Sequence, residues 1–202
     1  MYDSVALDAI PVDAEAVAGY TSGRWPTFKE IPARWPKAKH LSIAVNAEQD
    51  ADCLDIEKGD ANPAQAPAWV RRQIARGVKK PVVYSSVSDM PTVLSILDIS
   101  GIKRSQVRVW TAHYTLKPHR CDKSCGFGFN TTADATQYTN KALGKTLDAS
   151  LISDAFFDPG VPAAIRRKAL RAWILAHHAR GWTWTRLKKT AQWKAWRKLG
   201  GK

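Results

Sequence analysis

Short apolar runs alternate with helical patterns between residues 2 and 157. The apolar run that ends at Asp55 is followed by apolar positions at helical spacing over 65–76, and Gly77 ends that helix. A second run at 81–85 precedes a helical pattern over 90–97, and a third run covers 107–114. Strands that alternate with helices at this rhythm pair in parallel, so the pattern predicts a βα-type sheet.

Further short apolar runs lie at 2–7, 16–20, 40–45, 133–139 and 146–152, which brings the expected strands to eight. Eight such strands predict an α/β fold of the TIM type, a (β/α)₈ barrel with catalytic side chains at the C-terminal ends of its strands. We expect an abbreviated, irregular barrel, because about 155 residues are few against the usual ~250. The connections at 9–15 and 27–35 leave room for little helix.

Two carboxylates stand at the end of the first of these runs. Successive strand side chains alternate between faces, so Asp55 and Glu57 should point the same way, roughly 6.5–7 Å apart. Two acids held side by side shift each other's pKa values apart, which leaves one protonated and one charged near neutral pH. Glycosidases use such a pair to protonate the leaving oxygen and to stabilise positive charge. A solvated strand end or a cation site would show the same two residues.

Several motifs follow one another along the chain: Asp55-Ile56-Glu57, Val82-Val83-Tyr84-Ser85, Trp110-Thr111-Ala112-His113-Tyr114, Gln137-Tyr138 and Leu147-Asp148. In this order they resemble the motifs of glycoside hydrolase family 25 lysozymes. The chain is still more similar to a shorter group of family-25-like domains from actinobacteria and their phages, above all over residues 54–70. The resemblance covers roughly residues 2–157. The chain lacks the longer helices that follow the first strands of the lysozymes.

The resemblance implies a role for each acid. Glu57 corresponds to the general acid, and Asp55 to the carboxylate that stabilises the oxocarbenium ion or orients the N-acetyl group. Asp148 corresponds to the acid on the last strand and Asp3 to the acid on the first strand, with Asp8 as the alternative there. The expected substrate-binding residues are Tyr84, Trp110, Tyr114, Gln137 and Tyr138. No metal or other cofactor is expected at this site.

The resemblance implies a peptidoglycan hydrolase, an N-acetylmuramidase that cleaves the β-1,4 bond of the cell-wall glycan, and we expect it to be a monomer. The alternative is a non-catalytic cell-wall-binding or virion structural module on the same barrel. No signal peptide and no apolar run of about 20 residues is recognisable. We therefore expect synthesis in a host cytoplasm, with release by a phage or carriage in a virion to reach the wall.

The three cysteines do not form a disulfide framework. Cys53 is expected in the core. Cys121 and Cys125 lie in one loop, where a local disulfide or two free thiols is the simpler interpretation. A metal site that adds His119 and His113 is the alternative, although no second Cys/His pair completes a familiar zinc finger.

Charge separates the C-terminal region from the barrel. Residues 161–202 contain 12 Lys and Arg and no Asp or Glu, so residues 1–160 hold 19 basic and 18 acidic residues. The pattern predicts a barrel over 1–157, a linker over 158–162 and a basic, Trp-rich helical appendage over 163–202, with helices at 163–179 and 183–199. Its tryptophans could pack on the barrel, or its cations could bind anionic wall polymers or a membrane surface. Nucleic acid and a virion protein are further candidate partners.

Overall fold

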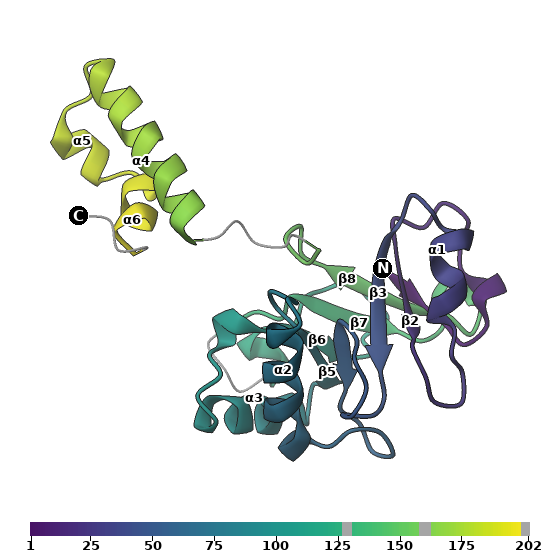
Figure 1. Ribbon diagram of the computed structural model, residues 1–202. Helices are drawn as coiled ribbons and strands as arrows, with labels where there is room; N and C mark the ends of the chain where they lie inside the picture. Colours follow the sequence, from purple (N-terminus) through teal and green to yellow (C-terminus); the bar gives the residue numbers. More distant parts are fainter. Residues whose placement is uncertain (127–130, 158–162, 199–202) are drawn as a thin grey trace. The chain divides into compact units, whose positions relative to one another are not determined.

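The computed structural model describes residues 1–126, 131–157 and 163–198, and the chain divides into two compact units, Met1–Phe157 and Asp158–Lys202. In the first unit eight strands close into a barrel in the order β1 to β8 (Figure 1). They are β1 (Tyr2–Asp3), β2 (Ala16–Tyr20), β3 (Lys39–Ala44), β4 (Cys53–Asp55), β5 (Val82–Ser86), β6 (Arg108–Ala112), β7 (Ala135–Thr139) and β8 (Asp148–Ile152). Each strand overlaps one of the eight apolar runs of the sequence.

The barrel is mixed rather than wholly parallel. Strands β1 to β7 pair in parallel with their neighbours, whereas β8 runs antiparallel to both β7 and β1. The expectation of parallel strands throughout is therefore wrong for β8. Residues 140–147, which include the 3₁₀ helix η6 (Ala142–Gly144), join β7 to β8. They are too few for a parallel crossover, which needs about a dozen residues or more.

Strands and helices alternate only loosely. The helix α1 (Ile31–Arg34) follows β2, α2 (Ala66–Ala75) follows β4, and α3 (Met90–Ile99) follows β5 (Figure 1). The other helical turns in these connections are short 3₁₀ helices: η1 (Leu7–Ala9), η2 (Phe28–Glu30), η3 (Pro63–Gln65), η4 (Arg104–Gln106) and η5 (Lys123–Cys125). The segment that enters η3 and α2 is held by a capping box, in which the Asn62 side chain accepts from the backbone N–H of Ala64 and the Gln65 side chain accepts from that of Asn62.

Side-chain alternation in β4 decides which residues enter the barrel. Leu54 belongs to a buried apolar cluster that includes Trp69 of α2 and Val93 of α3, between the sheet and these helices. Cys53 belongs to a second cluster, with Tyr84 and Trp110, in the barrel interior. Asp55 follows Cys53 at i+2, so it shares the interior face, at the end of the strand. Burial of Cys53 agrees with the core position expected for it.

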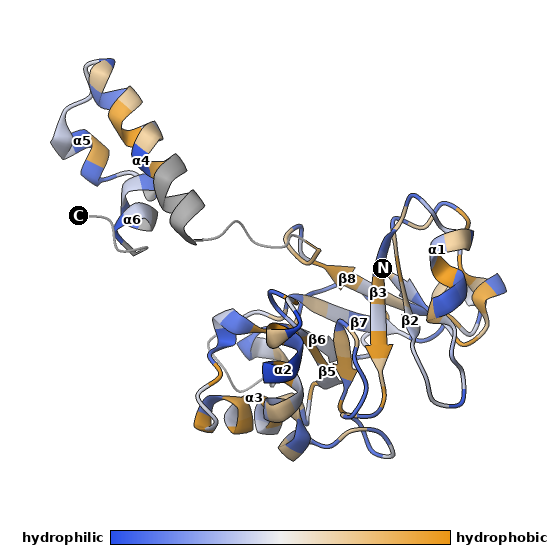
Figure 2. Cartoon of the chain, viewed as in Figure 1, coloured by the Kyte–Doolittle hydropathy of each residue, from blue (hydrophilic) through white to orange (hydrophobic). Residues whose placement is uncertain are grey.

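The second unit consists of α4 (Ala163–Ala179), α5 (Trp184–Lys188) and α6 (Ala191–Lys198). Ile174, Leu187 and Trp196 form its buried core, and Trp173, Trp182 and Trp193 pack against them. Hydrophobic and hydrophilic positions alternate along the coloured part of α4 (Figure 2). The expected linker at 158–162 lies outside the described residues. Among the described residues, no helix combines the length and the apolar character that a membrane span requires.

Candidate active site

Four carboxyl groups gather at one end of the barrel. Asp3 is the last residue of β1 and Asp55 is the last residue of β4, so parallel strands bring both to the same edge. Asp148 is the first residue of β8 and pairs with Asp3 across the two strands. Because β8 is antiparallel, its first residue lies at the edge where the parallel strands end. Glu57 follows β4 in a bend, two residues after Asp55.

Asp55 and Glu57 line one open cavity of about 470 Å³. The expected common orientation of this pair is therefore found, although the strand itself ends at Asp55. Other residues that line the cavity are Val5, Tyr20, Ser22, Gly23, Arg24, Trp25, Val45, Gly59 and Asp60. Its volume falls within the range of small-molecule pockets, roughly 300–1,000 Å³.

Burial sets the protonation of the acid pair. Burial, followed by the neighbouring carboxylates of Glu57 and Asp60, raises the pKa of Asp55 to about 8. Glu57 is half-buried, and burial together with the Asp60, Asp89 and Asp148 carboxylates raises its pKa above the ordinary value. Asp55 therefore keeps its proton at neutral pH.

Asp3 and Asp148 form a second carboxyl pair beside the first. A side-chain hydrogen bond joins them. Burial, the Asp148 carboxylate and the Asp55 carboxylate raise the pKa of Asp3 well above its usual range. Burial also raises the pKa of Asp148, while hydrogen bonds with Gln137 and Asp3 oppose that rise.

Two of these carboxyl oxygens have no partner within the protein. The Oδ1 atoms of Asp3 and Asp55 are buried and make no hydrogen bond. Buried polar atoms in folded proteins nearly always have a partner, so each exception needs an explanation. A ligand with hydroxyl or amide donors would supply the missing hydrogen bonds.

A hydrogen-bonded network crosses the barrel next to the acids. The Tyr84 hydroxyl donates to Oε1 of Gln137, and Nε2 of Gln137 donates to the hydroxyl oxygen of Tyr114 at 3.2 Å. Tyr84 and Gln137 are buried, whereas Tyr114 is 52% exposed. Burial, followed by nearby charge that includes the carboxylates of Glu57 and Asp3 in both cases, raises the pKa of Tyr84 and of Tyr114, which places both tyrosines near the carboxyl cluster. Tyr114 is thus the tyrosine of this network that can stack on a sugar.

None of the five expected substrate-binding residues is among those that line the cavity of Asp55 and Glu57. Trp110 is 1% exposed, packs against Tyr84 with ring centroids 4.6 Å apart, and donates to Oγ of Ser150 at 3.0 Å. It is a core residue. Tyr138 lies one residue after Gln137 on β7 and so faces away from it, lining a separate cavity with Tyr2 and Leu143. Asp8, the alternative first-strand acid, is 92% exposed in its side chain and pairs with Arg34.

Sequence reasoning missed Tyr20, Arg24, Trp25 and Asp60, which line the cavity. Tyr20 ends β2, the same strand-end position that identified the acids, so this signal was available. Arg24 lies over the ring of Trp25, 5.3 Å from its centroid, and Trp25 is 51% exposed. No pattern in the sequence places the loop after β2 beside the loop after β4.

Comparisons with known proteins bear on the fold alone. No protein-family model and no curated protein matches the chain. Among solved structures, the chain is similar to an uncharacterized protein of B. stearothermophilus, at 17% sequence identity and a TM-score of 0.50. The similarity covers 71% of this chain and 86% of that one. It supports an α/β barrel-like architecture.

Proposed function

We propose that this protein is a glycoside hydrolase of the muramidase type, which cleaves the β-1,4 bond after N-acetylmuramic acid in bacterial peptidoglycan. The observation that carries the proposal is the convergence of Asp55 and Glu57 on one open cavity, beside the pair of Asp3, which is buried, and Asp148, which is half-buried. The resemblance of the motifs to family 25 lysozymes supports the same reading. In this view the barrel is an abbreviated, irregular (β/α)₈ barrel of the TIM type, and the region from residue 163 is its basic appendage.

Each acid has a part in the proposed reaction. Glu57 has a raised pKa and lies in the open cavity, so it can hold the proton that the leaving glycosidic oxygen receives. Asp55, whose pKa is raised to about 8, must first release its proton to solvent water, and its carboxylate then stabilises the positive charge that develops on the sugar, because an opposite charge lowers a carboxyl pKa. The hydrogen-bonded pair of Asp3 and Asp148 accepts hydrogen bonds from the substrate and fixes its position.

The decisive experiment is a reducing-end release assay on purified peptidoglycan from several wall types, with mass spectrometry to identify the new reducing-end sugar. Release of N-acetylmuramic acid reducing ends supports the proposal. Binding to the same walls with no product under any condition would instead support the alternative, a non-catalytic cell-wall-binding or virion structural module on this barrel.

Replacing Tyr114 by alanine should raise KM for glycan chains by about 2- to 10-fold, because an exposed aromatic contact contributes roughly 0.5–1.5 kcal/mol. The matched control is Tyr138→Ala, which removes a tyrosine of β7 that lines a cavity separate from that of Asp55 and Glu57. Steady-state kinetics on soluble glycan fragments measure both variants. Equal effects at the two positions would contradict a substrate contact of Tyr114.

The basic helices are proposed to bind anionic wall polymers. Residues 161–202 carry 12 Lys and Arg and no acid, and their helices bury a core of their own. Trp184 is 43% exposed and is thus available for contact with a partner. An acid-free surface attracts polyanions, with a strength that falls as salt screens the charges.

Deleting residues 158–202 should weaken pull-down on whole cell walls and leave turnover on short soluble glycan chains nearly unchanged. Binding of the full chain should fall steeply between about 50 and 300 mM salt, because the screening length at physiological ionic strength is ~8 Å. Co-sedimentation with walls, anionic vesicles and DNA measures the preference. Wall binding that is insensitive to both salt and deletion would contradict the proposal, and equal binding to DNA or vesicles would assign the region to that partner.

A further inference from the structure

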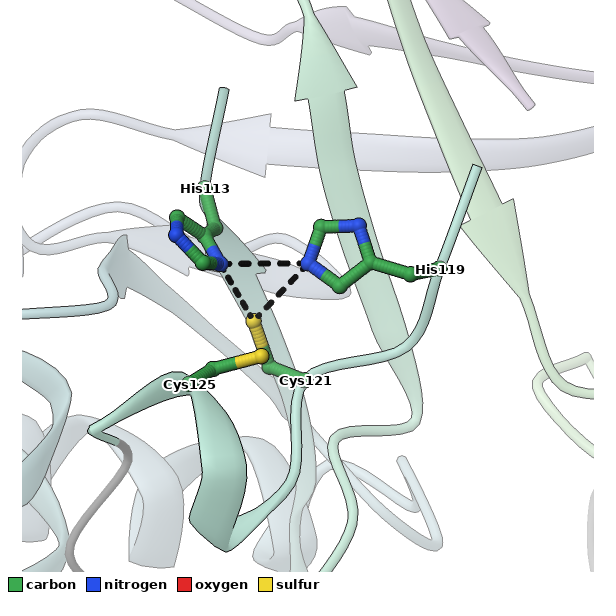
Figure 3. A group of neighbouring side chains, drawn as sticks. All are labelled: His113, His119, Cys121 and Cys125. Atoms are coloured by element: carbon green, nitrogen blue, oxygen red, sulfur yellow. Dashed lines mark hydrogen bonds between the residues drawn. The ribbon is translucent and has the colours of Figure 1, made fainter. Parts of the chain in front are cut away.

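A group of histidine and cysteine side chains lies in the connection between β6 and β7, outside the proposed active site. His113 follows the last residue of β6, His119 and Cys121 lie further along the loop, and Cys125 ends η5. Figure 3 shows the four side chains converging on one point from three parts of this connection. One ligand atom from each residue lies within 4.8 Å of all the others.

The distances between these atoms fit the edges of a metal-centred tetrahedron. Nδ1 of His113 and Nε2 of His119 are 3.1 Å apart, and Sγ of Cys121 is 3.4 Å from the first and 3.6 Å from the second. Tetrahedral zinc, with Zn–N of 2.0–2.1 Å and Zn–S of 2.3 Å, requires N···N edges of about 3.3 Å and N···S edges of about 3.5 Å. Three of the four ligand atoms therefore already stand at coordination spacing.

The surroundings orient the ligands for a metal. Nδ1 of His119 lies 3.0 Å from the carbonyl oxygen of Lys117, which only a protonated Nδ1 can satisfy. Nε2 of His119 then presents its lone pair to the cluster, as metal-bound histidines do when a backbone carbonyl fixes their tautomer. The backbone N–H of Cys121 donates to Oγ1 of Thr136 at 2.8 Å, which ties this ligand to β7.

Local interactions also fix the turn that carries Cys125. Asp122 caps η5 by accepting from the backbone N–H of Ser124 at 2.8 Å, and Gly126 ends the turn with a φ of +73°. All three cysteines are free thiols, so no disulfide occupies Cys121 or Cys125. Cys121 is buried and the other three ligands are half-buried, as in metal sites shielded from bulk water.

We propose that His113, His119, Cys121 and Cys125 bind one zinc ion. Two thiolates and two imidazoles select zinc over magnesium or calcium, which prefer oxygen ligands. Protein atoms fill all four positions, so the ion is structural rather than catalytic. The ion cross-links the β6–β7 connection near its start at His113. Tyr114 is the next residue in the chain. The ion thereby fixes the loop that carries an exposed tyrosine of the barrel end.

The test uses the full chain, purified under reducing conditions without chelator. We expect one equivalent of zinc by elemental analysis, and, after chelation and reloading with Co²⁺, the visible absorption bands of a tetrahedral thiolate complex. His119→Ala and Cys125→Ser should weaken zinc affinity by more than the 10–100-fold typical of losing a second-shell partner. His178→Ala, which removes a histidine of α4, is the matched control and should keep full affinity.

Folding of each variant is checked by circular dichroism, because Cys121 is buried and its replacement could unfold the loop. Cys125 is half-buried, so Cys125→Ser keeps the test interpretable. Zinc should raise the thermal midpoint of the wild-type chain and of His178→Ala, and it should leave the midpoint of Cys125→Ser unchanged. A reduced, folded chain that binds neither zinc nor Co²⁺, or a Cys125→Ser chain with unchanged zinc affinity, would overturn the proposal.

Discussion

Replacing Glu57 by glutamine should lower the rate of peptidoglycan hydrolysis by ~10²–10⁴-fold, the loss typical of removing a general acid. The amide fills the same space but cannot donate the proton that the leaving oxygen needs. Glu57 is half-buried and follows β4 in a bend, so the thermal midpoint should change little. Reducing-end release on purified walls measures the rate, and circular dichroism measures the midpoint.

The matched control for this variant is Glu30→Gln, the same chemical change at a side chain that is 64% exposed on η2. It should retain wild-type turnover. Wild-type turnover in Glu57→Gln would remove Glu57 from the mechanism. Loss of turnover in both variants would trace the effect to something other than the cavity.

Replacing Asp55 by asparagine should stabilise the folded protein at pH 8 while lowering hydrolysis by a similar ~10²–10⁴-fold. The side chain is 4% exposed, its Oδ1 has no hydrogen-bond partner, and burial raises its pKa to about 8. An ionised Asp55 at that depth opposes folding, and an amide cannot ionise. The free energy of unfolding at pH 8 should therefore rise relative to that of the wild type, because the amide avoids the cost of an uncompensated buried charge.

The direction of the pH dependence follows from proton binding. The pKa of Asp55 is near 3.8 in the unfolded chain and about 8 in the folded chain, so the folded chain binds more protons between these values. The contribution of Asp55 to the free energy of unfolding is therefore fully present below about pH 4 and decreases as the pH rises to 8. Each pKa unit corresponds to about 1.4 kcal/mol.

Chemical denaturation at pH 5 and pH 8 tests this linkage. The difference in unfolding free energy between Asp55→Asn and wild type should be larger at pH 8 than at pH 5. Asp98→Asn, at a side chain that is 69% exposed on α3, is the control and should not change the pH dependence. Identical pH dependence in Asp55→Asn and wild type would show that Asp55 is already ionised in the folded protein at pH 5.

The sequence by itself determined which segments become strands and which of their residues end them. The eight apolar runs correspond to β1–β8, because a buried strand needs apolar residues that are close together in the sequence. The pattern over 65–76 corresponds to α2, where the preceding Asn62 cap and Gly77, with a φ of +99°, are local signals. Asp55 and Glu57 were identifiable for the same reason, since two-residue periodicity places both on one side.

The tertiary structure decided what depends on distant neighbours. Closure of the barrel pairs β8 antiparallel with β1, which brings Asp148 next to Asp3, and the accompanying burial raises the pKa of both carboxyl groups. The same closure buries Trp110 against Tyr84 and turns Tyr138 to another cavity. Aromatic character alone cannot distinguish these environments.

In the loop between β6 and β7, too, the sequence indicated the residues and only the tertiary structure decided their arrangement. The sequence offered a Cys-x₃-Cys pair with two histidines nearby and left three interpretations open. Folding of the loop brings one ligand atom of His113, His119, Cys121 and Cys125 within 4.8 Å of all the others, a distance that no spacing rule supplies. Local periodicity specifies faces and ends of elements, whereas burial, pKa shifts and ligand geometry arise from contacts between residues far apart in the chain.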